Sequence, residues 1–191
     1  MVLVHDPQSI DRALAPGAAL DTLEQLRAEG KLRWIGISDR GHDTLRNAIR
    51  TGRFDSILTF GDYNLIRQTA LPLINEAWTA GLGVLVAHVF LAGLLAGPDP
   101  AVRVQGRGIP EHLRPDAVLA RDWWLWARER DVSLRALALQ YAMRNPMVST
   151  VLVGADSPDQ VDEIVAAALE PVSGGIWSEV EKRIAAQARL A

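Results

Sequence analysis

The chain has 191 residues, a length typical of one domain, and 49% of them are hydrophobic, which is enough for a buried core. It contains no cysteine, which excludes disulfides and thiolate metal sites and fits a cytoplasmic protein. The formal net charge of −3 gives no electrostatic reason to expect nucleic acid or a membrane surface as a partner. No apolar run approaches the roughly 18 residues of a membrane-spanning helix, and no basic segment marks a signal peptide.

Short β-rich runs alternate with longer helical patterns, which is typical of parallel β-α units. The predicted strands are 2–5, 32–37, 56–60, 83–87 and 148–153. The predicted helices are 18–29, 43–51, 68–80, 117–131, 134–145, 158–169 and 176–190.

Capping residues mark several of these helix boundaries. Gly30 and Gly52 are expected to end the helices that precede them. Ser133 and Ser157 are predicted N-caps, and Pro158 stands at the first helical position after Ser157.

The stretch 93–115 is rich in proline and glycine and is predicted to be a long loop within the domain. A loop of that length in a compact domain is usually functional or mobile. In the helix that follows, Trp123 and Trp126 are three residues apart and Trp124 lies on another face. We therefore expect at least one indole to pack against a neighbouring element.

Polar or turn residues follow every predicted strand. They are His5-Asp6, Ser38-Asp39, Gly61-Asp62, His88 and Gly154 to Asp156. Sites gather at this end of the strands both in (β/α) barrels and in doubly wound sheets. No G-x-G-x-x-G follows the first strand, so the dinucleotide-binding fingerprint of a Rossmann domain is missing.

Five segments resemble, in this order, the C-terminal part of an aldo-keto reductase: "VLVHDP", "LEQLRAEGKLRWIGIS", "FDSILTFGDYNLIRQ", "GVLVAHVFLAGLLAG" and "VSTVLVGADSPDQVDEIVAA". The look is closest to the bacterial sugar and aldose dehydrogenase branch. The resemblance implies an α/β fold of the (β/α)8 TIM-barrel type, with 1–191 as a single partial barrel domain holding units four to eight. Such barrels typically have about 250 residues.

The resemblance also implies an oxidoreductase that transfers a hydride between NAD(P) and a sugar or a small aldehyde or alcohol. Carbonyl reduction needs a hydride donor and a proton donor for the developing alkoxide. His5 matches the family histidine that orients the carbonyl. The family tyrosine, lysine and aspartate are not matched, and neither Tyr63 nor Tyr141 takes the place of the tyrosine. The chain alone is therefore expected to be inactive.

Cofactor positions are partly matched. Ser38 and Asp39 match the residues that hold the nicotinamide carboxamide, although the second is usually asparagine. The segment that wraps the adenosine end matches Gly154, Ala155, Asp156, Ser157 and Gln160. The positions where the family commonly has basic residues match Gly154 and Gln160, and Asp156 also stands in this loop. A 2′-phosphate would therefore meet no cation, and the resemblance favours NAD over NADP.

The four histidines lack the i, i+4 spacing of a metal site, so no metal is expected. His88 ends a strand beside the expected site and, with Phe90, is a candidate substrate contact. His42 and His112 are predicted to be solvated.

Two other interpretations remain open. The chain is alternatively a non-catalytic binding or scaffold protein, built from a partial barrel, whose bare edge strand 1–4 associates with a second copy or a separate N-terminal fragment. A third interpretation is another (β/α) barrel enzyme that binds phosphate at "VGADSP", although Asp156 argues against an anion there.

Overall fold

The computed structural model describes residues 1–7, 9–105 and 109–189. The chain divides into two compact units. Unit 1 comprises Met1–Tyr63, Gln68–Ala87 and Asn145–Leu152, and unit 2 comprises Asn64–Arg67, His88–Arg144 and Val153–Ala191.

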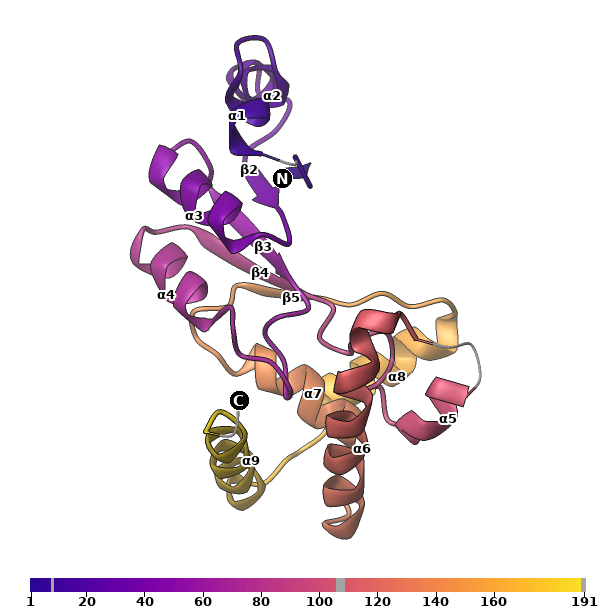
Figure 1. Cartoon of the computed structure of the whole chain (residues 1–191). Helices are drawn as coiled ribbons and strands as arrows, with labels where there is room; N and C mark the ends of the chain where they lie inside the picture. The colour runs from indigo at the N-terminus through magenta and orange to yellow at the C-terminus, as the bar shows by residue number, and fades with distance from the viewer. Residues whose placement is uncertain (8, 106–108, 190–191) are drawn as a thin grey trace. The chain divides into compact units, whose positions relative to one another are not determined.

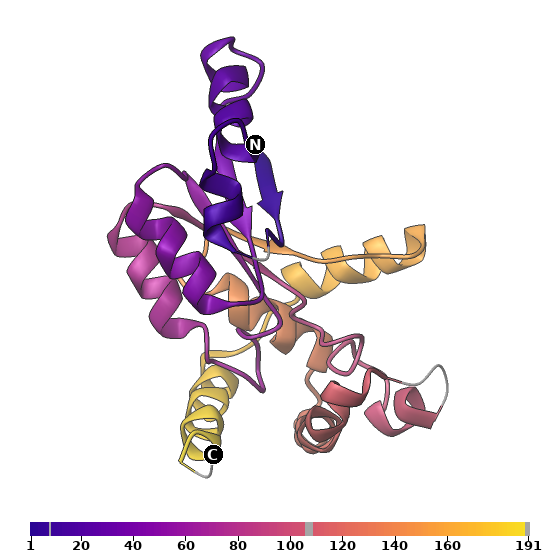
Figure 2. The same cartoon turned by 45° about the horizontal axis from the view of Figure 1, so that its top comes forward.

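Unit 1 is built on a five-stranded parallel sheet in which the strands follow one another in chain order. The strands are β1 (Val2–His5), β2 (Ile35–Ser38), β3 (Ser56–Phe60), β4 (Gly83–Ala87) and β5 (Thr150–Leu152). The helices of unit 1 are α1 (Ile10–Leu14), α2 (Ala19–Ala28), α3 (His42–Thr51) and α4 (Leu71–Thr79). In Figures 1 and 2, α3 and α4 lie side by side along one face of this sheet. Sequential parallel strands joined through helices are the repeating units of a (β/α) barrel.

The strand register decides which side chains share a face. His5 pairs with Ser38, Ser38 with Leu58, and Phe60 with Ala87. Because side chains alternate between faces along a strand, these residues lie on one face, the site face. Ile57, between Ser56 and Leu58, lies on the opposite face and is fully buried.

Gly36 explains how closely three strands meet on the site face. A Cβ atom at this position would lie 2.2 Å from Leu3 Cδ2 and 2.3 Å from Ser56 Oγ. Only glycine leaves room for both neighbouring side chains.

Unit 2 is helical. Its elements are α5 (Pro100–Gln105), η1 (Glu111–Leu113), α6 (Arg114–Glu129), α7 (Leu134–Met143), α8 (Pro158–Leu169) and α9 (Gly174–Gln187). Its core contains Trp123 and Trp126, which meet edge to face with ring centroids 5.5 Å apart. The expectation that an indole of α6 packs internally is confirmed, because Trp123 is fully buried.

Most predicted elements are present, with some shifted ends. The strands 2–5, 56–60 and 83–87 are observed as predicted, whereas the predicted strand 32–37 is observed as Ile35–Ser38. The stretch 93–115 contains α5 and η1. Ser133 and Ser157 are N-caps, as predicted.

Candidate functional site

The carboxyl ends of β1 and β2 bring His5 and Ser38 together. They are register partners on the site face, and the backbone N–H of Asp6 donates to the carbonyl oxygen of Ser38 at 2.9 Å. The His5 side chain is 81% exposed, with Nδ1 3.7 Å from Asp6 Oδ2. The imidazole is therefore open to a ligand at this edge of the sheet.

Ser38 has a buried side-chain hydroxyl on the site face. Its Oγ is buried and has no hydrogen-bond partner within the described residues of the chain. Leaving a buried donor or acceptor unpaired costs about 1–3 kcal/mol, so such a group in a native structure calls for an explanation. A polar group of a ligand at the end of β2 supplies one.

Asp39 shapes the turn after β2. Its Oδ1 accepts a hydrogen bond from the backbone N–H of Gly41 at 2.7 Å, and α3 starts at the next residue. This is the local turn that aspartate forms with the backbone two residues on. The carboxylate at this position is thus part of the turn that leads from the site face into α3.

Arg40 was missed by the sequence analysis as a neighbour of the site. The Arg40 guanidinium carbon lies 4.7 Å from the centroid of the Phe60 ring. Phe60 pairs in register with Ala87, whose small side chain adjoins the ring on the site face. These two residues are 20 apart in sequence and lie in different elements, so no local sequence pattern predicts their contact.

His42 belongs to a polar cluster on the other face of the sheet. Its Nε2 lies 2.5 Å from Asp62 Oδ2, and the Thr59 hydroxyl contacts both carboxylate oxygens of Asp62 at 2.6 and 2.7 Å. The prediction that His42 is solvated is wrong, because this side chain is mostly buried against Asp62. Thr59 points away from the site face, so the cluster ties α3 to the end of β3 and adds nothing to the site.

In unit 2, the residues predicted for the adenosine end form the start of α8. Ser157 Oγ accepts from the Gln160 backbone N–H at 3.3 Å, and Gln160 Oε1 accepts from the Asp156 backbone N–H at 2.8 Å. Apart from its two chain neighbours, no described residue has a heavy atom within 4 Å of a Cβ built on Gly154. Ala155 follows in the exposed turn before the helix. The backbone N–H groups of Asp156 and Gln160 are therefore paired with side chains of the same segment, while Gly154 and Ala155 before the helix are exposed.

The two candidate substrate contacts also lie in unit 2. His88 has a left-handed backbone with φ of 64°, and its carbonyl oxygen accepts from the Leu91 N–H at 3.1 Å. The Phe90 carbonyl oxygen accepts from the N–H groups of Gly93 and Leu95. Both side chains are half-buried beside this turn.

The predicted site residues thus form two groups, each within its own unit. Unit 1 holds His5, Ser38 and Asp39, and unit 2 holds the others. Among residues 1–7, 9–105 and 109–189, no three histidine or acidic side chains form a group able to hold a metal ion. No helix in the same residues is long and apolar enough to cross a membrane.

Comparison with known proteins places these features in context. A family model described as the aldo/keto reductase family matches residues 1–184. D-threo-aldose 1-dehydrogenase from Pseudomonas sp is 35% identical over 196 residues, which cover 100% of this chain and 56% of the relative. L-galactose dehydrogenase from Arabidopsis thaliana is 29% identical and is matched over 95% of this chain and 56% of the relative. The chain therefore spans about half the length of these curated relatives.

A solved structure supports the same relationship. The holo form of aldo-keto reductase AKR11C1 from Bacillus halodurans superposes with a TM-score of 0.68 and 25% identity. The match covers 94% of this chain and 59% of that one. The five βα units correspond to part of a (β/α)8 barrel.

Proposed function

The chain belongs to the aldo/keto reductase family, and we propose that it supplies the cofactor-holding and carbonyl-orienting part of an oxidoreductase site. Members of this family use NAD(P)H in general. The reaction we propose is hydride transfer to or from a sugar or a small aldehyde or alcohol. Two of the relatives described above are named as dehydrogenases of sugars, which supports this substrate class.

The observation that carries the proposal is the buried, unpaired hydroxyl of Ser38. A nicotinamide carboxamide has both a donor and an acceptor, and a serine hydroxyl pairs with either. The residues at the end of β2 therefore fit the group that the family binds. When bound, the reduced nicotinamide supplies the hydride for the carbonyl carbon.

His5 is proposed to orient the substrate. It stands beside Ser38 in the register, and neighbouring strands lie about 4.8 Å apart, so a carbonyl held by His5 is close to a ring held by Ser38. The exposed imidazole is free to hydrogen-bond the carbonyl oxygen and to polarise it. Proximity of this kind lowers the entropic barrier to transfer.

The proton donor is proposed to come from outside residues 1–191. Tyr63 is buried, and its hydroxyl accepts from Asn145 Nδ2 at 2.8 Å. Tyr141 packs against the hydrophobic core of unit 2. We propose that a separate N-terminal fragment or a further copy of the chain completes the site.

The start of α8 supports a preference for NAD. Asp156 precedes the helix and Asp159 lies in its first turn, so a 2′-phosphate bound at this helix start would meet further negative charge. A ribose 2′-hydroxyl, in contrast, donates to a carboxylate.

A second candidate function is a non-catalytic scaffold. Among the described residues, β1 pairs only with β2, and Met1 and Val2 are 58% and 41% exposed. An unpaired apolar edge strand favours association with another chain. In this case the edge is the functional surface, and cofactor binding is absent.

A titration separates the two candidates. The purified chain is titrated with NADH and separately with NADPH, while quenching of tryptophan fluorescence and energy transfer to the nicotinamide are recorded. Saturable binding that is tighter for NADH supports the oxidoreductase. Failure of both dinucleotides to bind contradicts it and favours the scaffold.

A further inference from the structure

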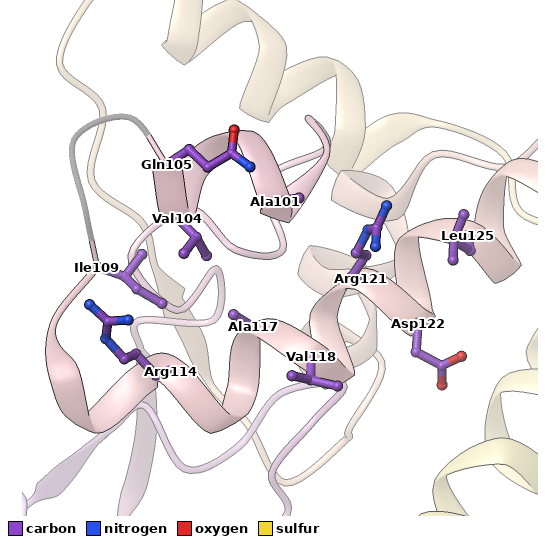
Figure 3. A pocket seen from close by; sticks show the side chains of 10 residues that line it. All are labelled: Ala101, Val104, Gln105, Ile109, Arg114, Ala117, Val118, Arg121, Asp122 and Leu125. Atoms are coloured by element: carbon purple, nitrogen blue, oxygen red, sulfur yellow. The ribbon is translucent and has the colours of Figure 1, made fainter.

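Unit 2 contains a cavity that holds none of the residues assigned above. It has a volume of about 510 Å³ and lies between α5 and α6 (Figure 3). Pockets for small organic ligands typically measure about 300–1,000 Å³. The cavity is therefore large enough for such a ligand.

The walls of the cavity are mainly apolar. Val104 contributes from α5, Ile109 from the segment before η1, and Ala117, Val118 and Leu125 from α6. Positions 114, 117, 118, 121 and 125 follow the spacing of a single helix face. Val118 is 74% exposed, so an aliphatic side chain stands open to a ligand on this face.

Two arginines line the cavity. Arg114 and Arg121 are two turns apart on α6, and both line the cavity. The third charged lining residue, Asp122, forms an ion pair with Arg183 of α9, and Figure 3 shows its side chain directed away from α5.

The arginines are only weakly engaged. Arg121 Nε lies 3.7 Å from Asp99 Oδ1, an oxygen that already accepts from the Ala101 N–H at 2.8 Å. Arg114 pairs with Glu111, whose side chain is 86% exposed. The exposed Arg114–Glu111 pair contributes little to stability, and the Arg121–Asp99 pair is long, so a ligand anion can compete with both carboxylates.

We propose that this cavity binds a small amphiphilic carboxylate, a molecule with one carboxylate and a medium-length alkyl chain. The carboxylate pairs with the guanidinium of Arg121, which is suited to bidentate contact. The alkyl chain covers Val104, Ile109 and Val118, and each methylene removed from water adds to the affinity. This site is independent of the oxidoreductase function.

Isothermal titration calorimetry of the full chain with decanoate tests the proposal, with decan-1-ol as a probe of equal chain length but no charge. Decanoate is expected to bind with one-to-one stoichiometry and decan-1-ol at least about tenfold more weakly. Arg121→Gln should weaken decanoate about tenfold and leave decan-1-ol unchanged. Val118→Asp should weaken both probes, and Lys182→Gln, an exposed charge removed elsewhere in unit 2, should change neither.

Equal affinity for the two probes, insensitivity of decanoate to Arg121→Gln, or no saturable binding would overturn the proposal. Because Val118 is exposed, Val118→Asp is expected to fold, and loss of binding in this variant then reports on the cavity. Sedimentation of the same variants tests whether a second copy of the chain, rather than a small ligand, occupies the cavity. A dimer that excludes decanoate and dissociates in Val118→Asp would show that a second copy fills the cavity.

Discussion

At the scale of a single residue, the proposed function rests on the buried hydroxyl of Ser38. Its place at the end of β2 is visible in the sequence, but its significance depends on burial and on the absence of a partner among the described residues. Neither property is encoded in the serine itself. Both follow from the strands on either side of it.

The unpaired hydroxyl leads to a prediction about stability. Ser38→Ala should leave the free energy of unfolding unchanged or raise it by about 1 kcal/mol, because the variant removes a buried polar group that has no partner. Urea unfolding of the ligand-free chain measures this. Ser56→Ala is the matched control, since Ser56 is equally buried on the same face but its hydroxyl contacts Met1 Sδ. A loss of more than about 1 kcal/mol in Ser38→Ala would mean that the hydroxyl has a structural partner.

Gly36 gives a second prediction at this scale. Gly36→Ala should lower the free energy of unfolding by about 1–3 kcal/mol, because the new methyl overlaps Leu3 and Ser56. Gly83→Ala is the control, since its nearest neighbour, Ser56 Cβ, lies at an ordinary 3.5 Å. Equal stability of the two variants in thermal unfolding would contradict the close packing of the first three strands.

At the scale of elements, charged side chains attach α2 to the rest of unit 1. Arg53, just beyond α3, donates to Asp21 and Glu24 of α2 at 3.0 and 2.7 Å. Hydrogen bonds from the Gly17 N–H and then from Arg53 lower the pKa of Asp21, and the hydrogen bond from Arg53 lowers the pKa of Glu24. Asp55 adds a further link, since its Oδ2 accepts from Arg27 and from the Ile35 N–H.

The direction of these pKa shifts sets a pH dependence. A carboxyl whose pKa is lower in the folded state stabilises the fold above its unfolded pKa, about 4, and loses that effect as the pH falls through its folded pKa. Arg53→Gln should therefore destabilise the chain at pH 7, and the difference from the wild type should shrink below about pH 4. Denaturant unfolding at several pH values tests this, with Arg50→Gln of α3 as the control. A difference that is constant with pH would exclude the ion pairs as its cause.

Local patterns predict some elements better than others. The strands 56–60 and 83–87 are mainly apolar runs bounded by turn residues, and both were predicted with their observed ends. The strand predicted at 32–37 starts later, at Ile35. The backbone N–H of Ile35 donates to Asp55, which lies 20 residues further along the chain. His42 was misjudged for the same reason, because its partner Asp62 is contributed by another β-α unit. The start of α8 was predicted correctly because its Ser-Pro signal is local.

The candidate site shows the same difference between features with a local sequence pattern and contacts between residues far apart in sequence. The sequence indicated that His5 and Ser38 end neighbouring strands, and the register confirms that they are partners. The Arg40–Phe60 contact and the cavity beside α6 depend on side chains that meet only in the folded chain.

At the scale of the whole molecule, the chain corresponds to 56% of its aldose dehydrogenase relative and 59% of a solved aldo-keto reductase. It contains His5 and Ser38, which we propose to orient the carbonyl and to hold the cofactor, and we propose no residue of the chain as the proton donor. We therefore expect cofactor binding to be separable from turnover. In the proposed function, this chain binds the cofactor, and turnover needs a proton donor from outside residues 1–191.

The most direct test of this account is the NADH affinity of Ser38→Ala beside that of Ser56→Ala, measured by tryptophan quenching in the full chain. Loss of one hydrogen bond worth about 1 kcal/mol predicts an affinity about fivefold weaker in Ser38→Ala. Ser56→Ala should bind NADH as the wild type does, because its hydroxyl lies at the opposite end of β3. Equal affinity of both variants and the wild type, or no NADH binding by any of them, would contradict the assignment of the nicotinamide to the end of β2.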